Sequence, residues 1–539
     1  MSVPQRVTQN KWFIYLRKGK RKQNMELLDK ILNQENLNKA YKKVVSNKGV
    51  AGVDGVTVDE VAKYIKEHKE EIINKIKERK YKPQPVKRVQ IPKENGKMRN
   101  LGIPTVIDRI IQQAMVQVLS PIFEEQFNDN SFGFRPGKSC EQAVIRALEC
   151  LNNGYDWIVD IDLEKFFDTV NQDRLITIIR RTIKDGDVVS LISKYLKAGV
   201  MDKGVIKPTK VGTPQGGNLS PLLSNIMLNE LDKELTARGL NFVRYADDCI
   251  ILVKSEKAAN RVLNSITKFI EKKLGLKVNA EKSKVTRPTQ TKYLGFSFWA
   301  TKGGKWKPKP HIKSYQKLKR KLKELTDRSW SISLDNRIKQ INYVVRGWVN
   351  YFRIANMKGK ITEIDEHLRT RLRVIIWKQW KRITRREKAL IQLGVEPILA
   401  HNIACSRKSY QLICKTDWLK FAINIERLRK RGLVFLLDQY TKVHIECTDW
   451  TAVYRTVRTV VWEGINKIII YSLLDYMKKF YFSSIGPIWV TVPAPCVKTI
   501  SFSFTLSFKY LTHSLKSGIY LACFPKEHIL STKSLEVIP

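Results

Sequence analysis

Two adjacent aspartates stand between two strand-like apolar runs in the segment FVRYADDCIILV, residues 242 to 253. Burying an unpaired carboxylate is costly, so a chain rarely places Asp247 and Asp248 between such runs without a partner for them. The segment predicts a strand–turn–strand hairpin that carries both carboxylates at its tip. We therefore expect a sheet whose end binds a ligand through carboxylate oxygens.

A second strand carries two further aspartates. The segment DWIVDIDLEKFFDTV, residues 156 to 170, predicts a strand that runs into a turn and a helix. Asp160 and Asp162 are two residues apart, which places them on one face of a strand. Carboxylates from two separate strand ends suit Mg²⁺, a hard ion that takes oxygen ligands and also bridges substrate phosphates. Two such ions can activate a primer hydroxyl and stabilise a leaving pyrophosphate.

The rest of the chain divides into two parts of different character. Residues 82–105 predict a β-hairpin with the turn ENGK, and helical spacing of apolar residues predicts helices over 106–127 and 219–235. Strands and helices alternate to about residue 300, which is typical of an α+β domain. From 311 to about 440 we expect helices only, because dense Lys and Arg with recurring Trp and Tyr follow helical spacing.

The charge balance indicates a polyanionic partner. The chain has 98 Lys and Arg against 51 Asp and Glu, a formal net charge of +47. Nucleic acid explains that excess better than a merely solubilising surface or an anionic membrane does. No run reaches the roughly 18 apolar residues that a membrane helix needs, and the N-terminus has no apolar secretory segment. The eight cysteines are scattered without any C-x-x-C, which favours a reduced, cytoplasmic setting.

Several motifs together resemble those of group II intron-encoded reverse transcriptases. YADD is similar to motif C, DLEKFFD to motif A, and TPQGGNLSPLLSNIMLNELDKEL to motif B of that family. Further segments match the family and occur in the family's order along the chain: GVAGVDGVT, IPKENGKMRNLGIPTVIDRIIQQAM, SFGFRPGKSCEQAV, GLKVNAEKSKV and YLGFSF. The segment INYVVRGWVNYFRIA resembles the maturase-specific region. The resemblance covers roughly residues 45 to 440.

The resemblance implies roles for individual residues. Asp162, Asp247 and Asp248 would be the catalytic aspartates and would bind two Mg²⁺ ions, and the choice of Asp162 over Asp160 comes from the resemblance alone. The implied nucleotide-binding residues are Lys93 and Arg99 for the triphosphate, Phe167 as the steric gate that selects dNTPs, and Gln215 with Gly216 near the base. Phe167 could instead be an ordinary packing residue. Lys284 is a weaker candidate for assisting the departure of pyrophosphate.

The implied fold is α+β, a right-hand polymerase with fingers and palm, followed by an all-helical thumb and maturase (X) domain. We expect an N-terminal extension of the fingers over 1–81, fingers and palm over 82–310, thumb and X domain over 311–440, and an atypical tail over 441–539. The implied partners are intron RNA, an RNA template, a DNA primer or target and dNTPs, with no membrane. Without any C-x-x-C, we expect no HNH endonuclease. The setting would be the bacterial cytoplasm, or an organelle.

The tail departs from the family pattern. Charged residues become sparse after residue 450, and no coherent amphipathic pattern appears there. The segment DWTAVYRTVRTVVWEG, residues 449 to 464, can be encoded by codons whose RNA forms a hairpin resembling domain V of a group II intron. Our hypothesis is that the reading frame slipped before about residue 450 and that the tail is translated intron RNA. The alternative is a divergent but genuine C-terminal extension.

Three functions fit these motifs. The first is an active RNA-directed DNA polymerase that also acts as a maturase and serves the mobility of its intron. The second is an RNA-binding splicing factor with an idle polymerase site. The third is a polymerase of the same fold outside introns, such as a retron-like or defence-associated enzyme. The complete set of aspartates favours the first over the second, and the maturase-like helices speak against the third.

Overall fold

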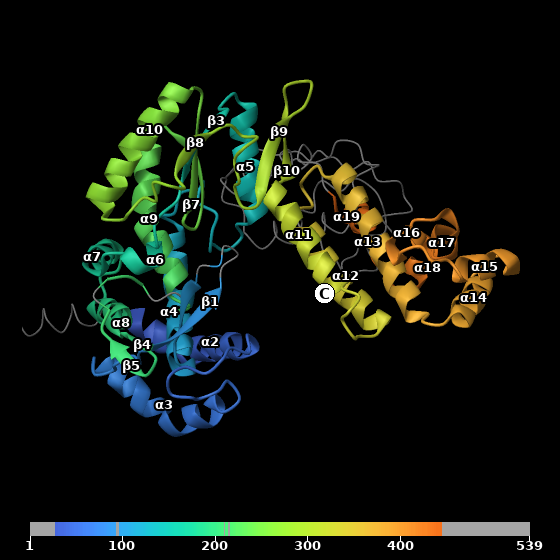
Figure 1. Ribbon diagram of the computed structural model, residues 1–539. Coiled ribbons are helices and arrows are strands. Elements are labelled where there is room, and N and C mark those ends of the chain that lie inside the picture. Colours follow the sequence, from blue (N-terminus) through green and yellow to red (C-terminus); the bar gives the residue numbers. More distant parts are fainter. Residues whose placement is uncertain (1–26, 93–95, 97, 210, 214–215, 445–539) are drawn as a thin grey trace, which may run out of the picture. The chain divides into compact units, whose positions relative to one another are not determined.

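The computed structural model describes residues 27–92, 96, 98–209, 211–213 and 216–444, and Figure 1 shows its elements. Strands lie in the first two thirds of this range, and helices α11 to α19 follow them. The predicted α+β class is confirmed. No helix among the described residues is long and apolar enough to cross a membrane.

The first sheet has the strand order β2-β1-β4-β5. Its strands are β1 (Val86–Pro92), β2 (Met98–Ile103), β4 (Val200–Asp202) and β5 (Val205–Lys207). β1 and β2 pair antiparallel from Lys87 opposite Ile103 to Pro92 opposite Met98, which confirms the hairpin predicted over 82–105. Strand β4 joins β1 in parallel, and the sequence analysis did not identify β4 or β5.

The second sheet has the order β6-β7-β3-β8, and all its neighbours pair antiparallel. Its strands are β3 (Trp157–Ile161), β6 (Asn241–Tyr245), β7 (Asp248–Val253) and β8 (Lys284–Thr286). The central strand β7 is buried from Cys249 to Val253, because its run of Ile, Leu and Val is covered on both faces. The hairpin predicted for residues 241–253 is confirmed, with Tyr245 opposite Asp248.

Helices cover these sheets and share one core with them. They are α2 (Gln34–Ser46), α3 (Val61–Lys77), α4 (Val106–Glu124), α5 (Cys140–Asn152), α6 (Phe166–Thr169), α7 (Gln172–Thr182), α8 (Gly186–Lys197), α9 (Ser220–Ala237), α10 (Glu256–Phe269) and the π-helical turn η1 (Ile270–Leu274). Buried apolar residues connect α2 and α4 with β3, β7 and α9 in a single cluster. The helices before residue 81 therefore pack into the same core as the segment that follows them.

The C-terminal helices follow a short hairpin of β9 (Phe296–Ala300) and β10 (Trp306–Pro310). They are α11 (Ile312–Leu325), α12 (Leu334–Tyr351), α13 (Lys358–Gln379), α14 (Ile383–Gln392), α15 (Pro397–Ala404), α16 (Tyr410–Ile413), α17 (Asp417–Ala422), α18 (Ile425–Lys430) and α19 (Leu436–Val443). Buried Asp365 on α13 accepts hydrogen bonds from the backbone of Leu436 and Leu437, which fixes the start of α19. The all-helical expectation for 311–440 holds for the described residues.

One joint connects α12 to the strand-containing part. Arg353 donates two hydrogen bonds to Glu141 at the start of α5, at 2.5 and 2.6 Å. The Tyr351 hydroxyl donates to the Leu294 carbonyl at 2.9 Å. Because a two-point arginine–carboxylate pair fixes orientation as well as distance, this joint constrains the end of α12.

Candidate active site

The aspartates lie at the ends of two neighbouring strands. In the antiparallel pairing of β3 with β7, Ile161 stands opposite Cys249, so the next residues, Asp162 and Asp248, follow at the same end of the sheet. Asp247 lies in the two-residue turn between Tyr245 and Asp248. The structure thus brings Asp162 and the Asp247–Asp248 pair together, although Asp247 follows Asp162 by 85 positions in the sequence.

The carboxylates influence one another electrostatically. The protein around Asp248 displaces water and raises the pKa of its carboxyl to about 6, and the negative charges of Asp247 and Asp162 add to that rise. At Asp162, the Lys282 ammonium lies 3.0 Å from one carboxylate oxygen. Crowded carboxylates repel one another, so a bound cation stabilises such a group.

Asp160 has a different setting from Asp162. It lies within the sheet, opposite Ile250 on β7 and Lys284 on β8. Burial raises the pKa of Asp160 to about 6, with a further contribution from Asp248, while Lys284 lowers it. Lys284, our candidate for assisting pyrophosphate departure, therefore lies beside Asp160.

The segment from Asn279 to Ser283 holds Asp162 in place. The Ser283 hydroxyl accepts from the Asp162 amide at 3.0 Å, and the Asn279 amide donates to the Asp162 carbonyl at 2.8 Å. Lys282, which pairs with Asp162, belongs to the same segment and was missed by sequence reasoning. The motif EKSKV contains both lysines, and only the pairing of β8 with β3 distinguishes them.

The donor set suits a magnesium site that substrate completes. Among the described residues, no three His, Cys, Asp or Glu side chains are placed to hold a metal ion by themselves. Mg²⁺ is commonly bound by one or two carboxylates, several waters and substrate phosphates rather than by an all-protein cage. Asp162 and Asp248, at the same end of the sheet, supply carboxylates of that kind.

The expected nucleotide-binding residues are only partly described. Lys93 and Gln215 lie outside the described residues. Arg99 lies on β2, where it is exposed and pairs across the hairpin with Ile91. Gly216 has a φ of 112°, and a β-carbon at this position would lie 2.2 Å from the Gly102 carbonyl oxygen. Only glycine fits there, because the loop at the start of motif B, before α9, approaches the backbone of β2.

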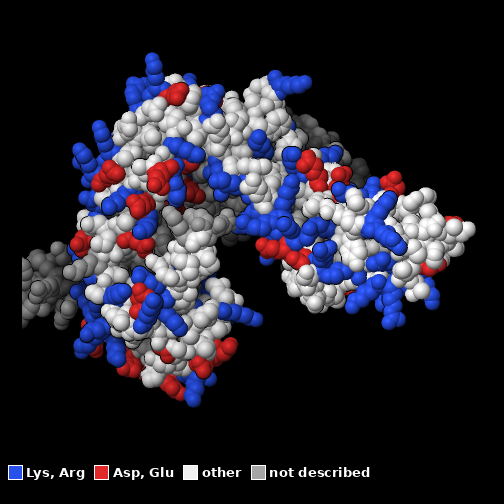
Figure 2. All heavy atoms as spheres, in the orientation of Figure 1, with Lys and Arg blue, Asp and Glu red and all other residues white. Residues whose placement is uncertain are grey.

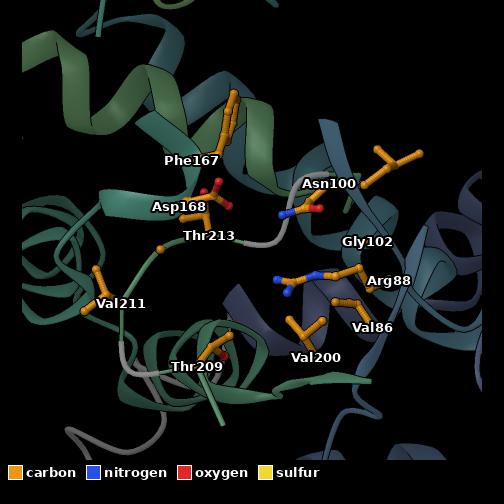
Figure 3. A pocket seen from close by; sticks show the side chains of 12 residues that line it. Val86, Arg88, Asn100, Gly102, Phe167, Asp168, Val200, Thr209, Val211 and Thr213 are labelled. Carbon is orange, nitrogen blue, oxygen red and sulfur yellow. The ribbon is translucent and has the colours of Figure 1, made fainter. Parts of the chain in front are cut away.

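A cavity of about 180 Å³ lies between the first sheet and the loop that precedes α9. Its lining includes Arg88, Asn100, Phe167, Asp168 and Thr213. In Figure 3 the Arg88 guanidinium and the Asn100 amide point into this space, whereas the Phe167 ring points away from Arg88. The buried Thr213 hydroxyl has no hydrogen-bond partner among the described residues, so it can bond to a ligand.

Phe167 combines packing with a place at this cavity. Its side chain is 9% exposed and packs edge-on against Phe166, with ring centroids 5.2 Å apart. Its carbonyl accepts a hydrogen bond from the Thr213 amide at 2.6 Å. Phe167 is therefore a well-packed residue at the cavity wall, and its role as a steric gate stays a prediction.

Basic side chains are spread widely over the surface. Figure 2 shows Lys and Arg on both the strand-containing part and the C-terminal helices, with acidic side chains in smaller groups among them. On α14 and just before it, Arg382, Arg385 and Lys388 are exposed. A surface of this kind attracts a polyanion through its phosphates.

Comparisons with known proteins agree with this arrangement. Residues 91–298 match the family model of reverse transcriptase (RNA-dependent DNA polymerase), and residues 315–393 match that of the group II intron maturase-specific domain. Protein YkfC of Escherichia coli (strain K12) is 34% identical over 299 residues, which are 48% of this chain and 78% of YkfC.

Two further relatives are named after introns. The group II intron-encoded protein LtrA of Lactococcus lactis subsp. cremoris is 33% identical over 340 residues, which are 51% of this chain and 56% of LtrA. The putative COX1/OXI3 intron 2 protein of Saccharomyces cerevisiae is 29% identical over 334 residues, which are 50% of this chain and 38% of that protein. The chain thus spans little more than half of LtrA and less of the yeast protein.

Proposed function

Because the chain belongs to the group II intron-encoded reverse transcriptases, we propose that it copies RNA into DNA and also binds its intron RNA to promote splicing and mobility. The observation that carries the polymerase proposal is the meeting of Asp162 with the Asp247–Asp248 turn at one end of the second sheet. Carboxylates brought together at the ends of two neighbouring strands can hold the two metal ions of an in-line nucleotidyl transfer.

Each residue has a defined task in this proposal. Asp162, Asp247 and Asp248 would hold two Mg²⁺ ions, which when bound activate the primer hydroxyl and stabilise the leaving pyrophosphate. Lys93 and Arg99 bind the triphosphate of the incoming dNTP, where the arginine fork suits phosphate oxygens. Lys282 would neutralise the Asp162 carboxylate until a metal ion and substrate bind.

Selection of the substrate falls to the loops around the cavity. Gln215 and Gly216 would lie near the base of the incoming nucleotide, and Phe167 would exclude a ribose 2′-hydroxyl. The close approach of Gly216 to Gly102 supports this, because it connects the loop at the start of motif B to the first sheet. The template is RNA, and the primer is DNA at the site where the intron inserts.

The second candidate is an RNA-binding splicing factor with an idle polymerase. It is supported by the match of residues 315–393 to the maturase-specific domain and by the net charge of +47. The retention of Asp162, Asp247 and Asp248 favours the polymerase, since a splicing factor has no use for these crowded carboxylates. The two candidates differ in whether the protein extends a primer.

Primer extension measured with and without Mg²⁺ tests the proposed polymerase activity. We expect the protein to extend a DNA primer on an RNA template with dNTPs and Mg²⁺, to stop when a chelator removes the metal, and to resume when Mg²⁺ is restored. RNA binding, measured by filter retention in the same buffers, should persist in the chelator. Tight RNA binding with no extension at any Mg²⁺ concentration would favour the splicing factor.

Binding of RNA is expected to depend steeply on salt. If about six phosphates are neutralised, affinity for intron RNA should fall about 1,000-fold between roughly 50 and 200 mM salt. Replacing Arg382, Arg385 and Lys388 by Ala should weaken binding and lower the slope of log K against log salt by about 0.7 to 0.9 for each phosphate that is no longer neutralised. Lys39, Lys75 and Lys420 are paired with nearby acids, and replacing them by Ala is the matched control. An unchanged slope in the α14 variant would remove these residues from the RNA surface.

A further inference from the structure

The turn that carries Asp247 contains a backbone conformation that alanine rarely adopts. Ala246 has a φ of 56°, in the left-handed region, at the first position of a two-residue hairpin turn. Glycine usually occupies this position because it has no β-carbon, so an alanine needs surroundings that hold it there. Whatever holds Ala246 also sets the direction in which Asp247 and Asp248 leave the turn.

Arg244 is placed to hold it. Its side chain is fully buried and points toward α9, where its Nε and Nη2 donate to the two carboxylate oxygens of Asp232 at 2.7 and 2.5 Å. The remaining nitrogen, Nη1, donates to the Asn225 side-chain oxygen at 3.1 Å and to the Ala246 carbonyl at 2.9 Å. One guanidinium thus connects α9 to the strained residue of the turn.

Gly133 contacts the turn from another direction. The Asn225 side-chain amide donates to the Gly133 carbonyl at 2.8 Å. Gly133 packs so closely that a β-carbon there would lie 2.2 Å from the Ala246 nitrogen. Two backbone hydrogen bonds join the segment 130–133 to Arg244. The Phe132 amide donates to the Arg244 carbonyl at 2.8 Å, and the Arg244 amide donates to the Asn130 carbonyl at 2.9 Å. Ala246 is therefore held between α9 and the segment 130–133.

A gain in folding stability does not by itself explain the buried ion pair of Arg244 and Asp232. Taking two charges out of water costs about as much as their attraction returns, so apolar residues of similar size commonly replace a buried pair without loss of stability. What apolar residues cannot supply is a directed hydrogen bond to the Ala246 carbonyl. The geometry is therefore that of a positioning device.

We propose that Arg244, Asp232 and Asn225 form a buried clamp that fixes the Ala246 carbonyl and thereby aims Asp247 and Asp248 at the metal ions. The proposal rests on the proposed polymerase function. Arg244 is a positioning residue here, since it acts through the turn and does not touch substrate. Loosening the clamp leaves the sheet intact and lets the two carboxylates move.

The decisive variant replaces the ion pair by apolar side chains, Arg244→Met together with Asp232→Leu. We expect it to fold with a Tm near that of the wild type, because the buried volume is kept and no lone charge remains. Its kcat for single-nucleotide addition should fall about 10- to 100-fold, with the KM for primer–template unchanged, as for residues that orient metal ligands. The half-saturating Mg²⁺ concentration should rise.

Binding of Mn²⁺ by the protein alone, followed by electron paramagnetic resonance, provides a readout that does not need activity. We expect the affinity of the double variant for Mn²⁺ to fall about 10-fold. Arg337→Met is the matched control, because Arg337 is also buried and donates to the carbonyls of Leu325 and Trp330 in the C-terminal helices. It should lower Tm and leave the Mn²⁺ affinity unchanged.

A folded double variant with wild-type kcat and wild-type Mn²⁺ affinity would overturn the clamp. If the double variant does not fold, Arg244→Lys decides, because lysine keeps the charge at Asp232 but lacks the fork that reaches Ala246. Wild-type values in that variant would equally overturn the proposal. If the wild type itself extends no primer, the polymerase proposal fails, and the Mn²⁺ measurement still decides on the clamp.

Discussion

Replacing Asp162 by Asn is expected to lower the rate of single-nucleotide addition at least about 1,000-fold, because it removes a carboxylate that the reaction's metal ions need. Replacing Asp160 by Asn should lower that rate less than about 10-fold, since Asp160 lies inside the sheet opposite Ile250 and Lys284. Single-turnover primer extension on an RNA template measures both. Asp160 lies in β3 and Asp162 directly follows the end of that strand, so each variant controls for the other.

Two outcomes would contradict the assignment of Asp162, rather than Asp160, as the metal ligand. If Asp160→Asn abolished extension and Asp162→Asn did not, the assignment of the metal ligand would be wrong. Equal large losses in both variants would show that the choice between the two residues does not hold. Thermal unfolding of each variant separates a loss of chemistry from a loss of fold.

Replacing Phe167 by Val is expected to lower the preference for dNTPs over rNTPs by about 10- to 100-fold, because a smaller side chain leaves room for a 2′-hydroxyl. The measurement is the ratio of kcat/KM for dCTP and CTP opposite a template guanine. Extension with dCTP should remain, since the three aspartates are untouched. The change in preference should come from better use of CTP.

Phe166 offers the matched control. It is 2% exposed and packs against Phe167, but it does not line the cavity. Phe166→Val should cost about 2 kcal/mol of stability and leave the preference for dNTPs unchanged. If Phe167→Val destabilised the protein in the same way without changing the preference, Phe167 would be a packing residue only.

The sequence was sufficient for features that local pattern determines. Alternating and continuous apolar runs predicted the β1–β2 and β6–β7 hairpins, and the strand pairing of both is confirmed. The β6–β7 turn lies where it was expected, whereas the predicted turn ENGK lies outside the described residues except for Gly96. Helical spacing predicted α4 and α9 to within a few residues. These elements depend on side chains that are close together in the chain.

Features that depend on long-range pairing were missed. Strands β4 and β5 are three residues each and have little pattern of their own, and β4 becomes a strand because it pairs with β1. Lys282 reaches Asp162 only through the fold of the segment after residue 279. Arg244 and Asp232 were unremarkable charges until the packing of α9 on β6 buried them together.

Single-nucleotide addition by the wild type and by the variant with Asp247→Ala and Asp248→Ala together tests the central claim most directly. The reaction contains an RNA template, a DNA primer, one dNTP and Mg²⁺, and RNA binding is measured on the same samples. We predict that the wild type adds the nucleotide, that the variant adds none, and that both bind RNA equally. Extension by the variant at the wild-type rate, or RNA binding by a wild type that extends nothing, would contradict the assignment of these aspartates to RNA-templated DNA synthesis.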